Sequence, residues 1–144
     1  MKKHEASIAT TTNLERAVAV HAQIPEFDSD YIAKKYIEKN VEDKSPYIVI
    51  GQIDKNDTAY MIGYNADNSM YLWLNGTAPE WRRHGLFALM LDELSQEAIR
   101  RGYKSITVKS YERFAPMLAA LKMFGFKRDN AEGEAIYLTK YLED

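Results

Sequence analysis

The chain has 144 residues, of which 46% are hydrophobic and 28% charged, and this fits one folded domain rather than a disordered or fibrous chain. Its 19 Lys and Arg nearly balance 21 Asp and Glu, so the net charge of -2 provides no overall attraction to nucleic acid or to an acidic membrane. The absence of cysteine excludes disulfides, a thiol nucleophile and Cys-based metal sites, and we expect no metal cofactor.

No targeting segment is evident at the start of the chain. Two lysines follow Met1, but no apolar stretch long enough for a signal peptide comes after them. No run of residues approaches the length that crosses a membrane, and no repeat or linker divides the chain. We therefore expect a cytoplasmic protein with a single domain over residues 1–144.

The first half of the chain combines strand and helix patterns. A helix is predicted from the cap residue Asn13 toward Pro25, and a second helix over residues 31–39. Alternating and β-branched residues, separated by turn clusters, predict strands over residues 4–10, 47–53, 59–65 and 70–75. The last three of these strands are joined by short loops and should form an antiparallel meander.

The second half contains two further helices. Apolar residues at three- and four-residue spacing between Leu86 and Ile99 predict a long helix, which ends at Gly102. A strand over residues 105–109, a helix over 113–124 and a closing strand over 134–142 follow. A strand, a long helix and another strand form a βαβ unit, whose strands should be parallel or splayed neighbours. This order predicts an α/β fold with one mixed sheet and helices on its faces.

Cationic side chains and a glycine crowd the start of the long helix: Arg82, Arg83, His84 and Gly85. Free N–H groups at a helix start bind anions, a glycine allows close approach, and arginine adds charge-assisted donors. Cations are unfavourable at this helix end unless an anion neutralises them, which favours an anion site. The alternative is that the preceding Pro-Glu pair merely starts the helix and the arginines are solvated surface.

The segment Arg-Arg-His-Gly-Leu-Phe-Ala at residues 82–88 resembles the acyl-coenzyme A motif of the GNAT N-acetyltransferase family, Arg/Gln-x-x-Gly-x-Gly/Ala. Arg82 takes the first place of the motif and Gly85 the second. Phe87 stands where the last small residue is usual, which suggests that it packs into the core, and Ala88 follows it. Residues 117–126, which end in Gly-Phe, are similar to a later helix of the family. The order of elements also matches, so that the resemblance covers nearly the whole chain.

The resemblance implies one mixed sheet of about six to seven strands, with helices on both faces and a splayed parallel pair, strands 70–75 and 105–109. Acetyl-coenzyme A would bind between these two strands and donate an acetyl group to a primary amine of a small molecule or protein. The competing interpretation of Asn75-Gly76 as a hairpin turn lacks a returning strand. The coenzyme would contact Leu74, Asn75, Gly76, Thr77, Arg82, Arg83, His84, Gly85, Leu86, Phe87 and Ala88.

The catalytic groups are less evident than the coenzyme site. Many relatives protonate the departing thiolate with a tyrosine, but Leu121 stands at that place, and Tyr111 is the nearest alternative, unless it is only a packed aromatic. The strand over residues 70–75 lacks the glutamate of many relatives, so Glu26 is the candidate base, or else an exposed loop residue. His21 and His84 have suitable intrinsic pKa values, although a packed role and a phosphate-loop role fit them better. A base is unnecessary if the amine arrives partly neutral.

Aromatic side chains are candidates for an acceptor pocket, although sheet packing accounts for many of them equally well. Tyr71 and Trp73 share one face of their strand by its period of two. With Tyr31 they are the residues we expect to bind the acceptor, while Tyr60 and Tyr64 are further candidates. A coenzyme A sensor without turnover and a small interaction domain remain as alternative functions. A homodimer is possible, and neither nucleic acid nor a membrane is expected as a partner.

Overall fold

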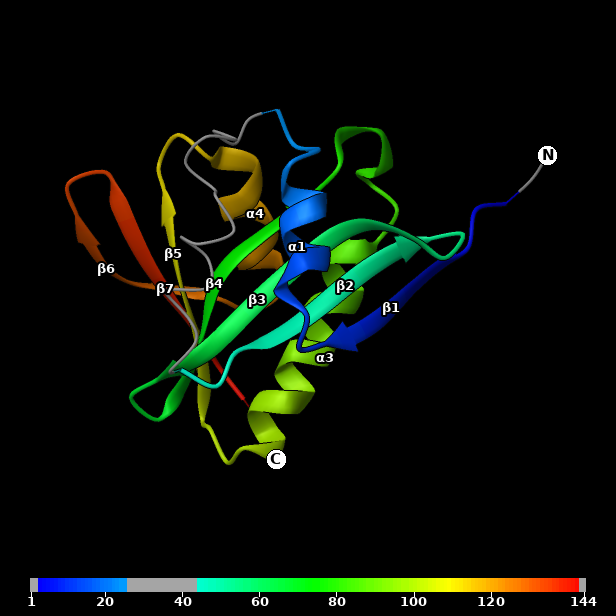
Figure 1. Cartoon of the computed structure of the whole chain (residues 1–144). Coiled ribbons are helices and arrows are strands. Elements are labelled where there is room, and N and C mark those ends of the chain that lie inside the picture. Colours follow the sequence, from blue (N-terminus) through cyan, green and yellow to red (C-terminus); the bar gives the residue numbers. More distant parts are fainter. Residues whose placement is uncertain (1–2, 26–43, 143–144) are drawn as a thin grey trace.

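A seven-stranded mixed sheet forms the centre of the protein (Figure 1). The computed structural model describes residues 3–25 and 44–142. The strands lie in the order β1-β2-β3-β4-β5-β7-β6. Their bounds are β1 Ala6–Thr11, β2 Tyr47–Ile53, β3 Asn56–Ala66, β4 Ser69–Thr77, β5 Ser105–Tyr111, β6 Lys127–Glu132 and β7 Ala135–Tyr141.

Helices cover both faces of the sheet (Figure 1). Helix α1, Leu14–His21, packs on β2, β3 and β4, while α3, Leu86–Arg100, and α4, Ala115–Met123, lie on the opposite face. A short 3-10 helix, Pro79–Trp81, lies between β4 and α3. Each face has its own hydrophobic core, one under α1 and a larger one under α3 and α4. The mixed sheet with helices on both faces confirms the predicted fold class.

Local signals in the sequence account for most of these elements. The side chain of Asn13 caps α1 by accepting a hydrogen bond from the N–H of Glu15 at 2.9 Å, as the cap pattern predicted. The strand over residues 47–53 and the antiparallel meander are confirmed. The helix predicted over residues 31–39 lies outside the described residues.

Strand β6 was not predicted, because its sequence Lys-Arg-Asp-Asn-Ala-Glu is exposed throughout and has no alternation of apolar and polar residues. It lies at the edge of the sheet, where charged residues discourage pairing with another chain. Its presence reverses the chain, so β7 runs antiparallel to β5. The prediction that strands 105–109 and 134–142 are parallel or splayed neighbours is therefore wrong, and the parallel βαβ unit is β4-α3-β5.

The parallel strands β4 and β5 pair over a short distance only. Their register joins Met70 to Ile106, Tyr71 to Thr107 and Leu72 to Val108. Beyond these pairs β4 continues to residue 77 and β5 to residue 111 without further pairing between them. The two strands therefore diverge, and backbone groups of β4 on this side need other hydrogen-bond partners. This agrees with the splayed pair that the family resemblance implies.

A β-bulge lies in β4 where the divergence begins. Ile62 of β3 pairs with Leu74 and Gly63 pairs with Leu72, so that Trp73 is an additional residue in β4. The side chains of Trp73 and Leu74 consequently both pack against the core under α1. A bulge bends its strand and increases the local twist, which helps to separate β4 from β5.

A buried histidine connects α1 to the sheet. His21 is 3% exposed, and its Nδ1 is hydrogen-bonded to the hydroxyl of the fully buried Tyr60. Burial lowers the pKa of His21 to about 4, so its ring is neutral at pH 7, and burial raises the pKa of Tyr60. His21 and Tyr60 are thus core residues rather than a catalytic base and a residue of an acceptor pocket.

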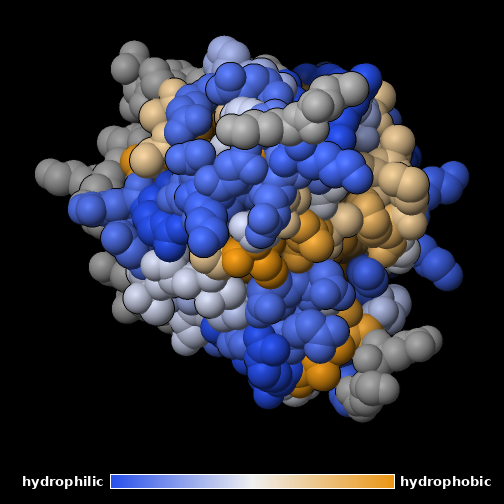
Figure 2. Space-filling view, turned by 90° about the vertical axis from the view of Figure 1, so that its right-hand side faces the viewer, coloured by the Kyte–Doolittle hydropathy of each residue, from blue (hydrophilic) through white to orange (hydrophobic). Residues whose placement is uncertain are grey.

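Strand β1 forms the second edge of the sheet, and Figure 2 shows the side of the molecule that carries it. This side is mostly hydrophilic, with a band of hydrophobic surface across its middle. Polar surroundings of an edge strand limit its pairing with other chains. Among the described residues, no helix has the length and apolar character required to span a membrane.

We expect the free energy of unfolding to decrease as the pH is lowered from about 6.5 to about 4. In this range the unfolded chain protonates His21 while the folded protein keeps it neutral, which costs on the order of 2 kcal/mol. Urea denaturation at several pH values measures this loss. In His21→Gln, which can still hydrogen-bond Tyr60 but cannot titrate, the dependence should be weaker. An equal pH dependence of the free energy of unfolding in both proteins would contradict the conclusion that His21 is held neutral in the folded protein.

Candidate active site

The open part of β4 provides an extended row of backbone groups. On one side Leu74, Asn75, Gly76 and Thr77 pair with β3, which holds the strand in place. On the other side they pair with no strand among the described residues. Alternate N–H and C=O groups of a strand point to each side, so this edge suits an extended ligand with amide groups. These four residues are the part of β4 that was predicted to bind the coenzyme.

The loop after β4 ends at the start of α3 in a form suited to an anion. Gly85 is the N-cap of α3 with a φ of 80°, a conformation that a side chain would strain. Arg82, Arg83 and His84 are exposed around it. Within the described part of the chain, no acceptor is found for the N–H groups of residues 83–88. Free N–H groups at a helix start, next to two guanidinium groups, are suited to binding an anion.

Arg82 also connects the loop to the strand. Its Nε donates a hydrogen bond to the carbonyl oxygen of Thr77 at 3.1 Å. The N–H of Ala78 donates to the carbonyl oxygen of Thr58 at 2.8 Å, which ties the strand end to β3. Arg82 therefore positions the loop in addition to contributing charge.

The ring of His84 belongs to a cluster of aromatic rings beside the loop. Its centroid lies 5.5 Å from the Trp81 ring, which in turn lies 4.9 Å from the ring of His4. His4 Nδ1 is 2.7 Å from Oδ2 of Asp54, in the turn between β2 and β3. Sequence reasoning missed His4 and Asp54 because only the tertiary fold brings them to the loop.

Phe87 packs on a neighbouring helix end, as the sequence suggested. Its ring centroid lies 5.7 Å from that of Phe124, which follows α4, and it adjoins the core under α3 and α4. Leu86 is buried in the same core, whereas Ala88 is half-buried. Phe87 thus fastens the start of α3 to α4.

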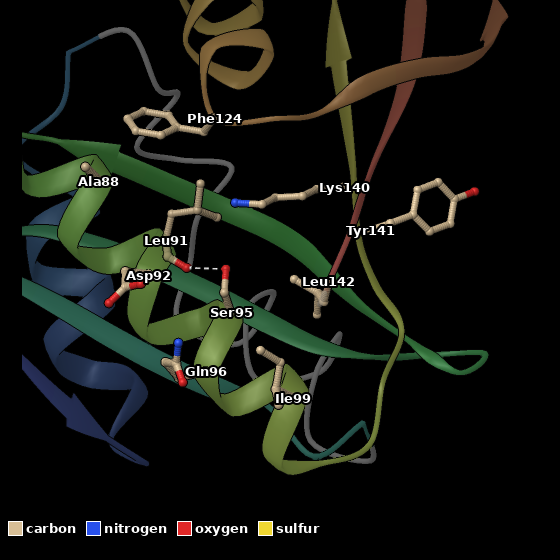
Figure 3. A pocket seen from close by; sticks show the side chains of 10 residues that line it. All are labelled: Ala88, Leu91, Asp92, Ser95, Gln96, Ile99, Phe124, Lys140, Tyr141 and Leu142. Carbon is tan, nitrogen blue, oxygen red and sulfur yellow. Dashed lines mark hydrogen bonds between the residues drawn. The ribbon is translucent and has the colours of Figure 1, made fainter. Parts of the chain in front are cut away.

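Two cavities lie away from the diverging strands. One of about 490 Å³ runs between α3 and the end of β7, where the side chain of Lys140 extends toward α3 (Figure 3). Ala88 is the only residue of the predicted coenzyme site in its lining. A second cavity of about 660 Å³ lies between α4 and β6. Neither lining includes residues 74–77 or 82–85. The candidate site therefore consists of the open edge of β4 and the loop before α3, and not of these cavities.

A surface of aromatic side chains, which we call the aromatic face, lies on the α1 side of the diverging strands and consists of Tyr64, Tyr71, Trp73, Tyr111 and Tyr137. The ring of Tyr64 lies 5.3 Å from that of Tyr71 and 5.9 Å from that of Trp73. Tyr71 and Trp73 therefore share a face as predicted. Burial, with smaller effects of Tyr64, Tyr137 and Tyr111, raises the pKa of Tyr71 to about 12. Its phenol is thus a neutral hydrogen-bond donor at pH 7.

Tyr111 ends β5 at the edge of the open region. Arg113 lies over its ring at 4.5 Å from the centroid, and the ring of Phe114 meets it edge-on at 5.8 Å. Leu121, at the place of the family tyrosine, is fully buried in the core under α3 and α4. Leucine has no proton to donate, so of these two positions only Tyr111, at the end of β5, could serve as a proton donor.

Sequence reasoning did not identify Lys109. Its Nζ lies 5.7 Å from the ring centroid of Tyr111 and 6.0 Å from that of Tyr137. A lysine at an outward position of a strand is usually solvated surface, so no local signal distinguishes it. The antiparallel pairing of β5 with β7 places Tyr137 directly opposite Lys109.

Two predicted site residues, Glu26 and Tyr31, lie outside the described residues. Their roles as base and as acceptor contact therefore stay predictions. In the described ranges, 3–25 and 44–142, no three His, Asp or Glu side chains form a group that could hold a metal ion.

Comparisons with known proteins place this geometry in context. Residues 48–108 match a family model described as an acetyltransferase (GNAT) domain. Among solved structures, the ribosomal-protein-S18-alanine N-acetyltransferase of Escherichia coli has a TM-score of 0.79 at 16% identity, covering 97% of this chain and 96% of that one. The PaiA N-acetyltransferase of Thermoplasma acidophilum in complex with coenzyme A has a TM-score of 0.74 at 14% identity, with 94% and 99% covered. A GNAT family acetyltransferase of Elizabethkingia anophelis with acetyl-CoA bound has a TM-score of 0.75 at 13% identity, with 95% and 98% covered. At these identities the similarity is one of fold, and no curated protein sequence matches the chain.

We predict that Phe87→Ala lowers the free energy of unfolding by about 2 kcal/mol, because it removes a half-buried ring that packs on Phe124. Leu89→Ala on the same helix is the matched control, since this side chain is 40% exposed and should cost less than about 0.5 kcal/mol. Urea denaturation compares the two variants. Equal losses would show that Phe87 does not fasten the helix start.

Proposed function

We propose that the chain is a GNAT-type acetyltransferase that moves an acetyl group from acetyl-coenzyme A to a primary amine by direct attack. The observation that carries this proposal is the open edge of β4 beyond Leu72, which continues into an anion-binding loop at the start of α3. An elongated cofactor with amide groups in its middle and phosphates at one end matches both parts. The absence of cysteine suits a reaction without a covalent enzyme intermediate.

We assign the two parts of the coenzyme to the two parts of the site. The amide groups of pantetheine would bond to the open edge of residues 74–77. The pyrophosphate would accept hydrogen bonds from the N–H groups of residues 83–88, with Arg82 and Arg83 supplying positive charge. Two proteins of the same fold have been solved with coenzyme A or acetyl-CoA bound, which supports this assignment.

The reaction itself requires few groups. The nitrogen of a neutral amine attacks the thioester carbon, a C–N bond forms and the C–S bond breaks. An N–H of the open β4 edge would stabilise the carbonyl oxygen as it becomes negative. The amine loses a proton to solvent, and the thiolate gains one, for which we propose the phenol of Tyr111 as donor. Tyr71 and Trp73 would contact the acceptor.

A coenzyme A sensor without turnover is the second candidate. The buried Leu121 favours it, because a common proton donor of the family is missing at this position. Measuring release of the free thiol from acetyl-CoA with a panel of primary amines separates the two functions. Release that depends on the amine supports the transferase, whereas coenzyme binding without release supports the sensor.

For Tyr111→Phe we expect a loss of roughly 10²-fold in kcat with little change in the KM for acetyl-CoA, because only proton donation is removed. Tyr141→Phe is the matched control, since this tyrosine is 71% exposed at the end of β7. Steady-state thiol release measures both variants. An unchanged kcat in Tyr111→Phe would remove this residue from the mechanism.

The variant Arg82→Ala/Arg83→Ala should weaken binding of coenzyme A by at least about tenfold, because each arginine is expected to contribute a charge-assisted contact to the pyrophosphate. Binding of a pantetheine fragment without phosphates should change much less. Lys127→Ala/Arg128→Ala removes the same charge from the edge strand β6, which β5 and β7 separate from β4, and serves as the control. Calorimetry measures the affinities of the unaltered protein and of both variants for each ligand.

Arg83→Ala alone separates charge from positioning, because Arg82 also holds Thr77. Weaker binding of coenzyme A in this single variant would assign part of the effect to charge. Equal losses for the coenzyme and for the fragment would mean that the arginines only shape the loop.

A further inference from the structure

The aromatic face carries positive charges for which the transfer reaction has no evident need. Lys44 Nζ lies 4.8 Å from the ring centroid of Tyr64, and Arg113 lies 4.5 Å from that of Tyr111. Lys109 Nζ lies 5.7 Å from the ring centroid of Tyr111 and 6.0 Å from that of Tyr137. A ring face attracts a cation, so these contacts hold the three charges close to the aromatic face.

Several carboxylates among the described residues near this side of the sheet already have partners. Asp57 makes two hydrogen bonds of 2.9 Å to Arg16 of α1, and Asp129 accepts a hydrogen bond from Thr139. Glu134 lies 3.4 Å from Arg113 and offsets part of its charge. Over the residues that the structure describes, no carboxylate is within ion-pair distance of Lys109. Its ammonium group is therefore a positive charge beside Tyr111 and Tyr137 that no described carboxylate neutralises.

The position of Lys109 in the sheet gives its charge a definite place. It directly follows Val108, the last residue of β5 that pairs with β4. The side chain of Val108 is buried under α3 and α4, so that of Lys109 projects on the other side, where its contacts with Tyr111 and Tyr137 lie. An amine that attacks a thioester held between the diverging strands would approach over this point.

A cation at this point has two effects on an amine. It disfavours the ammonium form and so lowers the pKa of the bound amine, which increases the neutral fraction that can attack. It also attracts an anion elsewhere on the same molecule through charge-assisted hydrogen bonds. A molecule with an amine alone would be repelled in its protonated form, whereas one with an additional carboxylate would be bound.

We infer that the acceptor is an amine that also carries a carboxylate, which binds Lys109 while its apolar part lies on the aromatic face. The inference rests on the proposed function, because it assigns the acceptor of that reaction. Free amino acids and peptides with an acidic residue near the N-terminus share this chemistry. The transfer step is unchanged: the amine becomes an amide, and coenzyme A leaves with a free thiol.

The test measures kcat/KM for acceptors that differ only in the carboxylate. Phenylalanine, phenylalanine amide and phenethylamine represent the free amino acid and its uncharged counterparts. A short peptide with Glu near its N-terminus and the same peptide with Gln represent the second source. We expect the carboxylate-bearing member of at least one set to be preferred by roughly tenfold or more, and the set that shows the preference identifies the source.

Charge variants assign the preference to Lys109. Lys109→Met, of similar size but neutral, should remove the preference, and Lys109→Glu should reverse it, with the KM for acetyl-CoA unchanged. Lys122→Glu makes the same charge change on α4, on the opposite face of the sheet, and should keep the preference. Equal rates for charged and uncharged acceptors, or a preference that persists in Lys109→Glu, would overturn the inference.

Failure of the proposed function can be distinguished from failure of this inference. If the protein is not a transferase, no thiol is released with any acceptor, although coenzyme A still binds. In that case ligand-observed NMR on the coenzyme A complex measures binding of the same acceptors directly. Binding of the carboxylate-bearing compounds that is lost in Lys109→Glu would support Lys109 as their site, and binding that is unchanged, or absent from the unaltered protein, would overturn it.

Discussion

The candidate site depends on the separation of two parallel strands after the pairs that end at Leu72 and Val108. A strand inside a sheet must find partners for its backbone groups, and β4 loses those of β5 while it keeps those of β3. The result is an edge that is rigid on one side and open on the other. The bulge at Trp73 contributes to this separation by bending and twisting β4 at the same point.

The same strand leads directly into the loop before α3, which is the proposed anion site. Hydrogen bonds from Ala78 to Thr58 and from Arg82 to Thr77 hold the strand end and the loop together. Phe87 then fastens the start of α3 to the residue that follows α4. Both parts of the proposed coenzyme site thus come from one continuous segment, residues 72–88, with its charges at one end and its open backbone at the other.

This continuity explains how much of the site could be predicted from the sequence. The Asn13 cap, the strand Tyr47–Ile53 and the start of α3 after Gly85 depend on neighbouring residues, and the sequence indicated them correctly. The bulge at Trp73, the edge strand β6 and the charge of Lys109 on the aromatic face depend on pairing between distant segments. No local pattern carries that information, since β6 has no apolar alternation and a strand lysine is ordinarily solvated.

One departure from the pattern of the GNAT family that the chain resembles fits the charge of the aromatic face. The β4 strand has no carboxylate to accept a proton from the amine, and the described residues around the splay contribute lysine and arginine to the aromatic face instead. A cationic environment lowers the pKa of a bound amine, which reduces the need for a base in the same place. Lys109 is exposed, so water and salt weaken the electrostatic attraction between its ammonium group and a carboxylate. We therefore expect its charge to affect which acceptor is preferred more than how tightly any one acceptor binds. The missing carboxylate in β4 and the cations of the aromatic face thus support the proposal of an acceptor site that selects its ligand by charge.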